Sequence, residues 1–296
     1  MSAAAPDRGP LYELGRFLEI QNIGLNLPFA LAFLVLASGG LPSLWVVLLV
    51  VVAFVAARNA GHSFNRWADR DLDAANPRTR SRAIPAGRRS PRSALLIAAL
   101  SGAILLGAAY LLNPLAFVLA PVALALVFGY TYTKRFTALT TPFLGLVEAV
   151  TPAAVFIAVL GRLPWVVLLA VGGLLAWGTA FETVHSLGDV ESDRALHLRS
   201  LPVRLGVPAS VRLVPVLHAV ALGLLATFGI ALELRVPYFL GLAGMALLAA
   251  LSDHELARAP TSPRGPFQRH FIMAGLYLAG VVVALFLPLG PQVPGL

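Results

Sequence analysis

Cysteine is absent from the 296-residue chain, and charge is scarce. The lack of cysteine excludes disulfide bonds, thiolate metal sites and a cysteine nucleophile. Only 12% of the residues are charged, whereas 58% are hydrophobic and the mean hydropathy is +0.82. A soluble globular domain carries roughly 25% charged residues. The composition therefore predicts a polytopic membrane protein.

The N-terminal segment lacks the pattern of a signal peptide. It contains Asp7, Glu13 and Glu19, and it has no short apolar core followed by a small-residue cleavage site. A signal peptide has a basic start and an apolar core. We therefore expect no signal peptide.

Lysine is nearly absent, because Lys134 is the one lysine among 22 basic residues. The formal net charge of +8 would suggest nucleic acid on a soluble protein. No basic helix, zinc-ligand pattern or aromatic RNA motif accompanies these arginines, so we expect no nucleic-acid partner. Membrane proteins concentrate basic residues in their cytoplasmic loops, so the positions of the arginines test the topology instead.

Nine apolar segments approach the roughly 20 residues that a helix needs to cross the hydrocarbon core. They lie near residues 23–41, 43–63, 93–112, 114–131, 142–160, 163–182, 210–230, 235–252 and 270–289. All but two of the 22 basic residues, Arg162 and Arg235, fall in alternate connections. This predicts an all-α polytopic fold of nine transmembrane helices with a cytoplasmic N-terminus, and it places residues 287–296 on the opposite side.

The acidic residues gather in the two long connections on this basic side. Asn65, Asp69 and Asp73 are spaced i, i+4, i+8, so they would share one face of a helix that continues past the second span. Asp189 and Asp193 repeat the i, i+4 spacing in the second connection. Like charges at this spacing repel each other. Such helices therefore need a compensating cation.

Carboxylate and amide oxygens without a Cys or His partner suit Mg²⁺, which completes its shell with water and phosphate oxygens. Two facing carboxylate pairs would hold two ions against a diphosphate. Lys134 and Arg135, between the fourth and fifth spans, would complete an anion clamp. The pattern therefore favours chemistry in which diphosphate is released.

An alternative interpretation is that these acids pair with neighbouring arginines on a solvated loop. The arginines available are Arg66, Arg70, Arg78 and Arg194. Two matched motifs on one side of the membrane favour the functional interpretation. Asp71 and Glu191 fall off the shared helix faces, and we expect them at the surface.

Other polar residues in or beside the spans are further candidates. Glu148 is an isolated acid within a span and is a functional candidate for that reason. His185 lies one helical turn before Asp189 and would orient a ligand, contact an acceptor, act as a base or serve structure alone. Gln21, Asn22 and Asn26 would bind an acceptor's polar end or bond neighbouring helices.

Taken together, these motifs resemble the UbiA superfamily of intramembrane prenyltransferases. The likeness rests on the N-x-x-x-D-x-x-x-D motif, on NPRTRSRAIPAG after it, on YTYTKRFT at residues 130–137, and on DVESD at 189–193 followed by RSLPVRLG. It covers nearly the whole chain, and no single motif carries it. The 4-hydroxybenzoate polyprenyltransferase-like branch, with its relatives in the futalosine route to menaquinone, is the most similar.

The resemblance implies a single domain over residues 1–296, with nine helices around a central cavity and the acidic motifs at its cytoplasmic mouth. It implies Mg²⁺-dependent transfer of a polyprenyl group from polyprenyl diphosphate to an aromatic acid, 4-hydroxybenzoate-like or hydroxynaphthoate-like, in ubiquinone or menaquinone biosynthesis. The location would be a bacterial or archaeal inner membrane. The implied metal ligands are Asp69, Asp73, Asp189 and Asp193, with Asn65 as a further candidate. The implied catalytic residues are these four aspartates with Lys134, and the implied substrate contacts are Asn65, Arg78, Tyr130, Arg135, Glu182 and His185.

Aromatic rings near the motifs would shelter the allylic cation that forms when diphosphate leaves. The candidates are Phe64, Trp67, Tyr130 and Phe181, and ordinary packing is the alternative for each.

Two positions depart from the family pattern. Arg66 follows Asn65 where many members have Asp, and Glu182 and His185 stand where many have Asp and Tyr, so the carboxylate is kept and the hydroxyl is lost. Two other functions fit the sequence less well. Prenyl transfer to a haem or chlorophyll-type ring is one, and a transporter is the other, although transporter sites lie near the membrane midplane.

Overall fold

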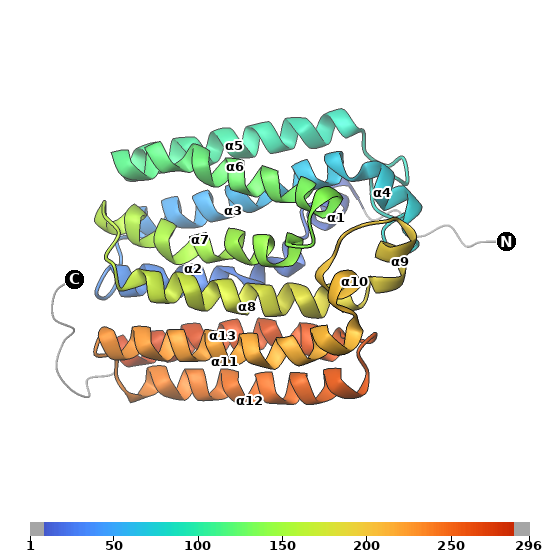
Figure 1. Cartoon of the computed structure of the whole chain (residues 1–296). Coiled ribbons are helices and arrows are strands. Elements are labelled where there is room, and N and C mark those ends of the chain that lie inside the picture. The colour runs from blue at the N-terminus through green and yellow to red at the C-terminus, as the bar shows by residue number, and fades with distance from the viewer. Residues whose placement is uncertain (1–8, 287–296) are drawn as a thin grey trace.

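The computed structural model describes residues 9–286, and every regular element in that range is a helix. Eight of the helices are long and apolar enough to cross a membrane, and they run side by side as one bundle (Figure 1). These are α3 (Leu44–Ala68), α5 (Pro91–Leu112), α6 (Pro114–Phe136), α7 (Thr140–Leu160), α8 (Val167–Leu187), α11 (Val207–Ala231), α12 (Val236–Arg258) and α13 (Arg264–Phe286). The predicted all-α fold is confirmed, and the chain is an integral multi-pass membrane protein.

The first predicted span, near residues 23–41, forms a shorter element than the others. It consists of a 3₁₀ helix, η1 (Ile20–Leu25), followed by α2 (Leu27–Ala37). Most of α2 is buried, and it packs against α7 and α13. Its hydrophobicity therefore serves the protein core more than the lipid. The predicted end of the last span and residues 290–296 lie outside the described residues, as do residues 1–8.

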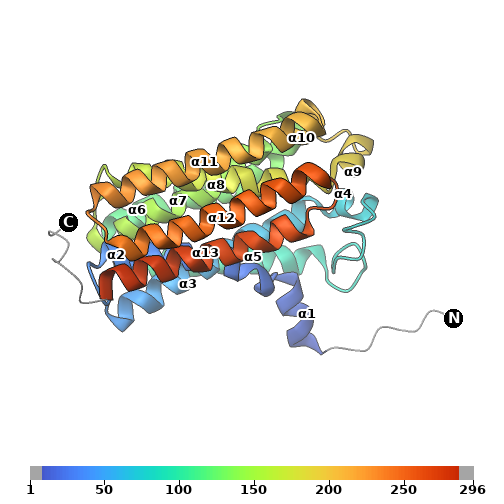
Figure 2. The same cartoon turned by 90° about the horizontal axis from the view of Figure 1, so that it is seen from below.

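Four short helices gather at one end of the bundle. They are α1 (Pro10–Phe17), α4 (Arg70–Ala75), α9 (Val190–Ala195) and α10 (Leu201–Leu205). Figure 1 places α4, α9 and α10 close together at this end, and Figure 2 shows α1 projecting at an angle from the long helices. Because α4 and α9 carry the two acidic motifs, segments about 120 residues apart in the sequence become neighbours.

Helix α8 lies at the centre of the packing. In its most apolar window 67% of the residues are buried, against 11% for α6. Small residues let α7 and α8 approach closely. A Cβ atom added at Gly145 would lie 2.8 Å from the backbone nitrogen of Thr179 and 2.9 Å from the carbonyl oxygen of Leu175. The glycine is therefore needed for the close approach of these two helices.

A polar chain joins α11, α12 and α13. Asp253 Oδ1 lies 3.0 Å from His218 Nδ1, and His218 Nε2 lies 3.2 Å from His270 Nε2. His270 Nδ1 contacts the carbonyl oxygen of Pro266 at 2.8 Å. A carbonyl oxygen only accepts, so His270 carries its proton on Nδ1 and His218 must donate from Nε2.

We predict that Gly145→Ala lowers the thermal stability of the protein, because the new methyl group meets backbone atoms of α8 that have no room to move. Overpacking of this kind costs about 1–3 kcal/mol. Thermal unfolding in detergent measures the effect. Gly107→Ala is the matched control, since a Cβ there meets nothing within 4 Å. Equal melting temperatures for the two variants would contradict the close-packing argument.

Candidate active site

The two acidic motifs share a break in the helix at their first aspartate. Helix α3 ends at Ala68, Asp69 has φ −97° and ψ 8°, and α4 begins at Arg70. Helix α8 ends at Leu187, and Asp189, with φ −109° and ψ 2°, precedes α9. Each motif therefore continues into a separate six-residue helix, and the prediction of one unbroken helix is wrong at this point.

The i, i+4 spacing is kept at the break because i, i+4 backbone hydrogen bonds form on both sides of Asp69 and after Asp189. The amide of Asp69 donates to the Asn65 carbonyl at 2.8 Å, and the amide of Asp73 donates to the Asp69 carbonyl at 2.7 Å. The amide of Asp193 donates to the Asp189 carbonyl at 2.8 Å. Within each motif, the second aspartate therefore lies one helical turn after the first, as the i, i+4 spacing predicts.

Asp69 is 1% exposed and is surrounded by donors. Lys134 Nζ lies 2.6 Å from Oδ2 of Asp69, and the side-chain amide of Asn65 donates to the same oxygen at 2.7 Å. Arg135 Nη2 lies 3.3 Å from Oδ1 and also donates to the carbonyl of Ala68 at 2.7 Å. The structure thus brings together the predicted ligands Asn65 and Asp69 and the predicted clamp.

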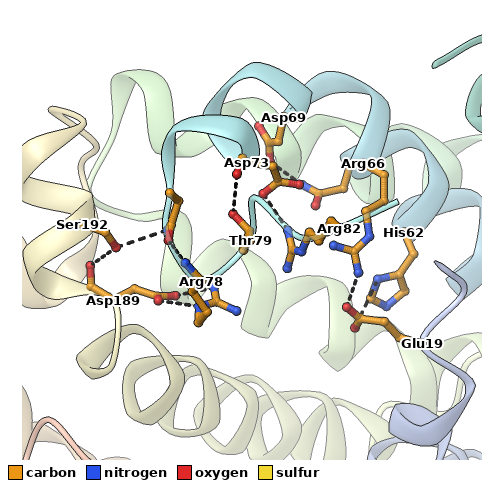
Figure 3. Close-up of polar contacts among 12 residues, drawn as sticks. Glu19, His62, Arg66, Asp69, Asp73, Arg78, Thr79, Arg82, Asp189 and Ser192 are labelled. Carbon is orange, nitrogen blue, oxygen red and sulfur yellow. Dashed lines mark hydrogen bonds and ion pairs between the residues drawn. The ribbon is translucent and has the colours of Figure 1, made fainter. Parts of the chain in front are cut away.

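Asp73 is also buried, and it uses a partner from the following loop. Arg82 Nη1 donates to Asp73 Oδ1 at 2.7 Å, and the hydroxyl of Thr79 donates to the Asp73 carbonyl at 3.0 Å (Figure 3). Oδ2 of Asp73 is buried and has no hydrogen-bond partner within residues 9–286. One carboxylate oxygen is therefore left for a further ligand.

A short polar chain links the two motifs. Arg78 holds Asp189 through two bonds of 2.7 Å, from Nε and Nη2. The side-chain amide of Asn76 donates to Ser192 Oγ at 3.2 Å, and Ser192 Oγ donates to the Asp189 carbonyl at 2.9 Å. Asp193 follows one turn later, and burial raises the pKa of its carboxyl group. Figure 3 shows Arg78 reaching from the first motif's loop to Asp189.

A cavity of about 330 Å³ extends from this end into the bundle. Its walls are mainly apolar side chains of α3, α5, α6 and α7. Its polar lining residues are Glu19, Asn22, Asn26, Arg58, His62, Tyr130, Thr151, Glu148, Glu182 and His185. The four motif aspartates do not line the cavity, but α3 and α8 each run from its wall into a motif. The predicted substrate contacts Tyr130, Glu182 and His185 all face it.

The structure gives partners to the isolated polar groups of the cavity wall. Asn26 donates to Glu148 Oε1 at 3.2 Å, so a residue at the start of α2 meets one within α7. His185 Nδ1 lies 3.9 Å from Glu182 Oε1. Of the predicted polar group before the first span, Asn22 and Asn26 line the cavity and Gln21 is exposed.

The aromatic candidates divide into two sets. Tyr130 and Phe181 line the cavity. Phe64 instead packs against Phe128 and Trp67, with ring centroids 4.6 and 5.5 Å away, and neither Phe64 nor Trp67 is among the lining residues. Only the first set is therefore placed to meet a substrate in the cavity.

A second charged group lies where the N-terminal segment meets α3. The Glu19 carboxylate pairs with Arg66 and accepts from the Asn22 amide at 3.0 Å, and His62 Nδ1 lies 3.9 Å away. Arg58 donates to the carbonyls of Leu18 and Glu19 at 2.7 and 3.0 Å. Burial alone would raise the pKa of Glu19, but the nearby positive charges, Arg66 foremost, lower it to about 2.

Some of these pairings could be anticipated and others could not. Arg78 pairs with Asp189, as the solvated-loop interpretation expected, whereas Arg70 pairs with Asp71, which is not a motif aspartate. Arg82 was missed, although it lies within the NPRTRSRAIPAG run that carries the resemblance. The pair of Glu19 and Arg66 spans 47 residues, and no sequence pattern indicates it.

The donor set fits a hard divalent cation. No three His, Asp or Glu side chains in residues 9–286 converge closely enough to hold a metal ion, and Asp69, Asp73 and Asp189 each face a basic partner instead. The free oxygen of Asp73 and the amide of Asn65 add to the carboxylates as oxygen ligands. Oxygen donors of this kind suit Mg²⁺.

Comparison with known protein families assigns the chain to one of them. The model of the UbiA prenyltransferase family matches residues 26–272, and the chain belongs to this family. It is a membrane-embedded prenyltransferase.

Relatives extend over most of the chain. The 4-hydroxybenzoate octaprenyltransferase of Azoarcus sp. strain BH72 is 35% identical over 263 residues, covering 86% of this chain and 90% of the relative. That of Shewanella sediminis is 31% identical over 230 residues, covering 77% and 80%.

Solved structures share the fold. The apo structure of a UbiA homolog from Aeropyrum pernix K1 has a TM-score of 0.81 and 29% identity, and the match covers 89% of this chain and 98% of that one. A UbiA homolog from Archaeoglobus fulgidus bound to GPP and Mg²⁺ has a TM-score of 0.73 and 18% identity over 92% and 99%.

We predict that the stability contributed by Glu19 depends on pH. Its folded pKa of about 2 lies below the ordinary value of about 4.3, so its contribution is present above pH 4.3 and is lost as the pH falls toward 2. Melting temperatures of the wild type and Glu19→Gln should therefore differ at pH 7, and the difference should shrink below pH 4.3 and vanish only as the pH approaches 2. Glu13→Gln, whose ion pair with Arg88 is exposed, should show little difference at either pH.

Proposed function

We propose that this chain catalyses Mg²⁺-dependent transfer of a polyprenyl group from polyprenyl diphosphate to an aromatic acid, with release of diphosphate. The observation that carries the proposal is the joining of two aspartate motifs, through Asn76 and Ser192, at the end of the bundle where α3 and α8 leave the wall of an apolar cavity. The names of the curated relatives support a phenolic acid as acceptor rather than a haem or chlorophyll-type ring. The pathway would be ubiquinone or menaquinone biosynthesis.

In this proposal the carboxylates of Asp69, Asp73, Asp189 and Asp193 hold Mg²⁺. The bound cation would neutralise the diphosphate and make it a better leaving group. Lys134, Arg135 and Arg78, which now neutralise the aspartates, would turn to the diphosphate oxygens. The same basic side chains thus balance the carboxylates before binding and the leaving group afterwards.

The remaining steps would take place in the cavity. Its apolar walls accept a polyprenyl chain without special contacts, and Tyr130 and Phe181 place aromatic faces beside it. Glu182 and His185 lie on α8, two turns and one turn before Asp189 respectively, and we propose that they contact the acceptor and take the proton that its ring loses. Water is kept from the allylic carbon by the surrounding apolar side chains.

We place this site on the cytoplasmic side of the inner membrane. The end of the bundle that carries α4 and α9 also holds most of the basic residues, which membranes retain in the cytoplasm. We further propose that residues 1–296 form a single domain.

The direct test is an assay with the purified protein in lipid, Mg²⁺, a polyprenyl diphosphate and a panel of aromatic acids, with products identified by mass spectrometry. We expect a prenylated acid and one diphosphate per turnover, and chelation of Mg²⁺ should stop the reaction. A folded protein that prenylates no acceptor in the panel would overturn the proposal.

We predict that Asp69→Asn and Asp189→Asn each abolish turnover while the protein still inserts and folds, because each variant removes a charged metal ligand from a motif. Asp71→Asn is the matched control, since the Asp71 side chain is 85% exposed and contacts Arg70. It should retain wild-type turnover. Full activity in both ligand variants would refute the metal assignment.

A further inference from the structure

Arg66 is an unusual arginine for its surroundings. It is 7% exposed, and its Nη1 is buried without a hydrogen-bond partner in the described part of the chain. Its other terminal nitrogen pairs with Glu19. An arginine fork matches a carboxylate through two parallel bonds. Arg66 therefore has half of its fork unused, in a place where an unsatisfied donor is costly.

Glu19 lies between Arg66 and the cavity. Glu19, Arg58 and His62 line the cavity, whereas Arg66 is not among its lining residues. The carboxylate that faces the cavity thus covers the guanidinium behind it. Figure 3 shows Glu19, His62 and Arg66 grouped on the opposite side of the view from Asp189 and Ser192.

The backbone at Glu19 has an unfavourable conformation that neighbouring residues hold in place. Its φ of 51° and ψ of 46° are left-handed, a conformation that non-glycine residues seldom adopt. Arg58 fixes the carbonyls of Leu18 and Glu19. Protein contacts therefore keep a strained residue at this position.

We propose that Arg66, together with His62, is the receptor for the carboxylate of the acceptor acid, and that Glu19 occupies this receptor until the acid displaces it. The inference rests on the proposed function and names the acceptor's binding group. One carboxylate replaces another, so the positive charge of Arg66 stays compensated in both states. An acceptor without a carboxylate would have no means of displacing Glu19.

The observations favour the acid over the diphosphate at this receptor. Lys134 and Arg135, on α6, contact Asp69. Arg66 lies on α3 three residues before Asp69, but its side chain pairs with Glu19 instead. The receptor also borders the cavity wall at His62, one turn before Arg66 on α3. This position also gives a role to Arg66, the residue that departs from the family pattern after Asn65.

Binding of matched probes to the purified full-length protein in lipid tests the inference. The probes are 4-hydroxybenzoate and a hydroxynaphthoate, each compared with its neutral amide by calorimetry. We predict that Arg66→Gln weakens binding of the acid by about 10- to 100-fold and leaves the amide unchanged. Glu19→Gln should act in the opposite direction and tighten acid binding several-fold, because it removes the competing charge. Arg70→Gln, on the solvated face of the same stretch, should change neither.

Three results would overturn the inference. Equal losses of acid and amide binding in Arg66→Gln, with melting temperature unchanged, would show a structural role alone. Weaker acid binding in Glu19→Gln would show that Glu19 does not compete. A rise in KM for the prenyl diphosphate, with KM for the acid unchanged, would assign Arg66 to the diphosphate. Should Arg66→Gln fail to fold, Arg66→Lys keeps the charge, and we expect it to lose part of the acid affinity.

Asp69→Asn separates this inference from the proposed function. It should abolish transfer and retain acid binding with the same preference for acid over amide. Acid binding with this preference in a wild-type protein that shows no prenyl transfer would support the receptor while refuting the reaction. Prenyl transfer by a protein that shows no preference for the acid over its amide would support the reaction and refute the receptor.

Discussion

Carboxylates that leave water need a cation beside them, and this requirement organises the end of the bundle where both acidic motifs lie. Asp69 has Lys134 and Arg135, Asp73 has Arg82, and Asp189 has Arg78. These cations come from loops and from other helices, so each pair also fastens one segment to another. Removing a partner from such a pair leaves a buried charge uncompensated. The short helices α4 and α9 thus keep their positions through charge balance as much as through apolar packing.

The pairing of carboxylates with basic side chains is confined to one end of the bundle, and the cavity beyond it is mainly apolar. The cavity continues from the charged end between α3, α5, α6 and α7, whose inward residues are mostly aliphatic. Charged groups at the mouth can exchange one partner for another without net change in charge. Apart from a few polar side chains such as Glu148 and Thr151, the walls behind them offer dispersion and exclusion of water. A substrate with an anionic head and a long hydrocarbon tail matches this division.

Much of the fold follows from the sequence, because length and hydropathy determine which segments cross a membrane. The i, i+4 spacing likewise identified Asp69, Asp73, Asp189 and Asp193 before their surroundings were known. The breaks at Asp69 and Asp189 were not predictable, since a helical spacing continues across them. Contacts between distant segments could not be predicted from the sequence either. Asn26 and Glu148, for example, are 122 residues apart, and their hydrogen bond depends on how α2 and α7 pack.

The chain of Asp253, His218 and His270 bears on how the C-terminal helices behave in an energised membrane. With His270 protonated on Nδ1, one proton is shared between Asp253 and His218, and the three groups sum to zero charge whichever of the two holds it. A transmembrane voltage acts on an uncompensated charge with about 2.3 kcal/mol per 100 mV. It does no work on this neutral chain when α11, α12 and α13 shift together. A concerted shift of these three helices therefore moves no net charge of this chain through the membrane field.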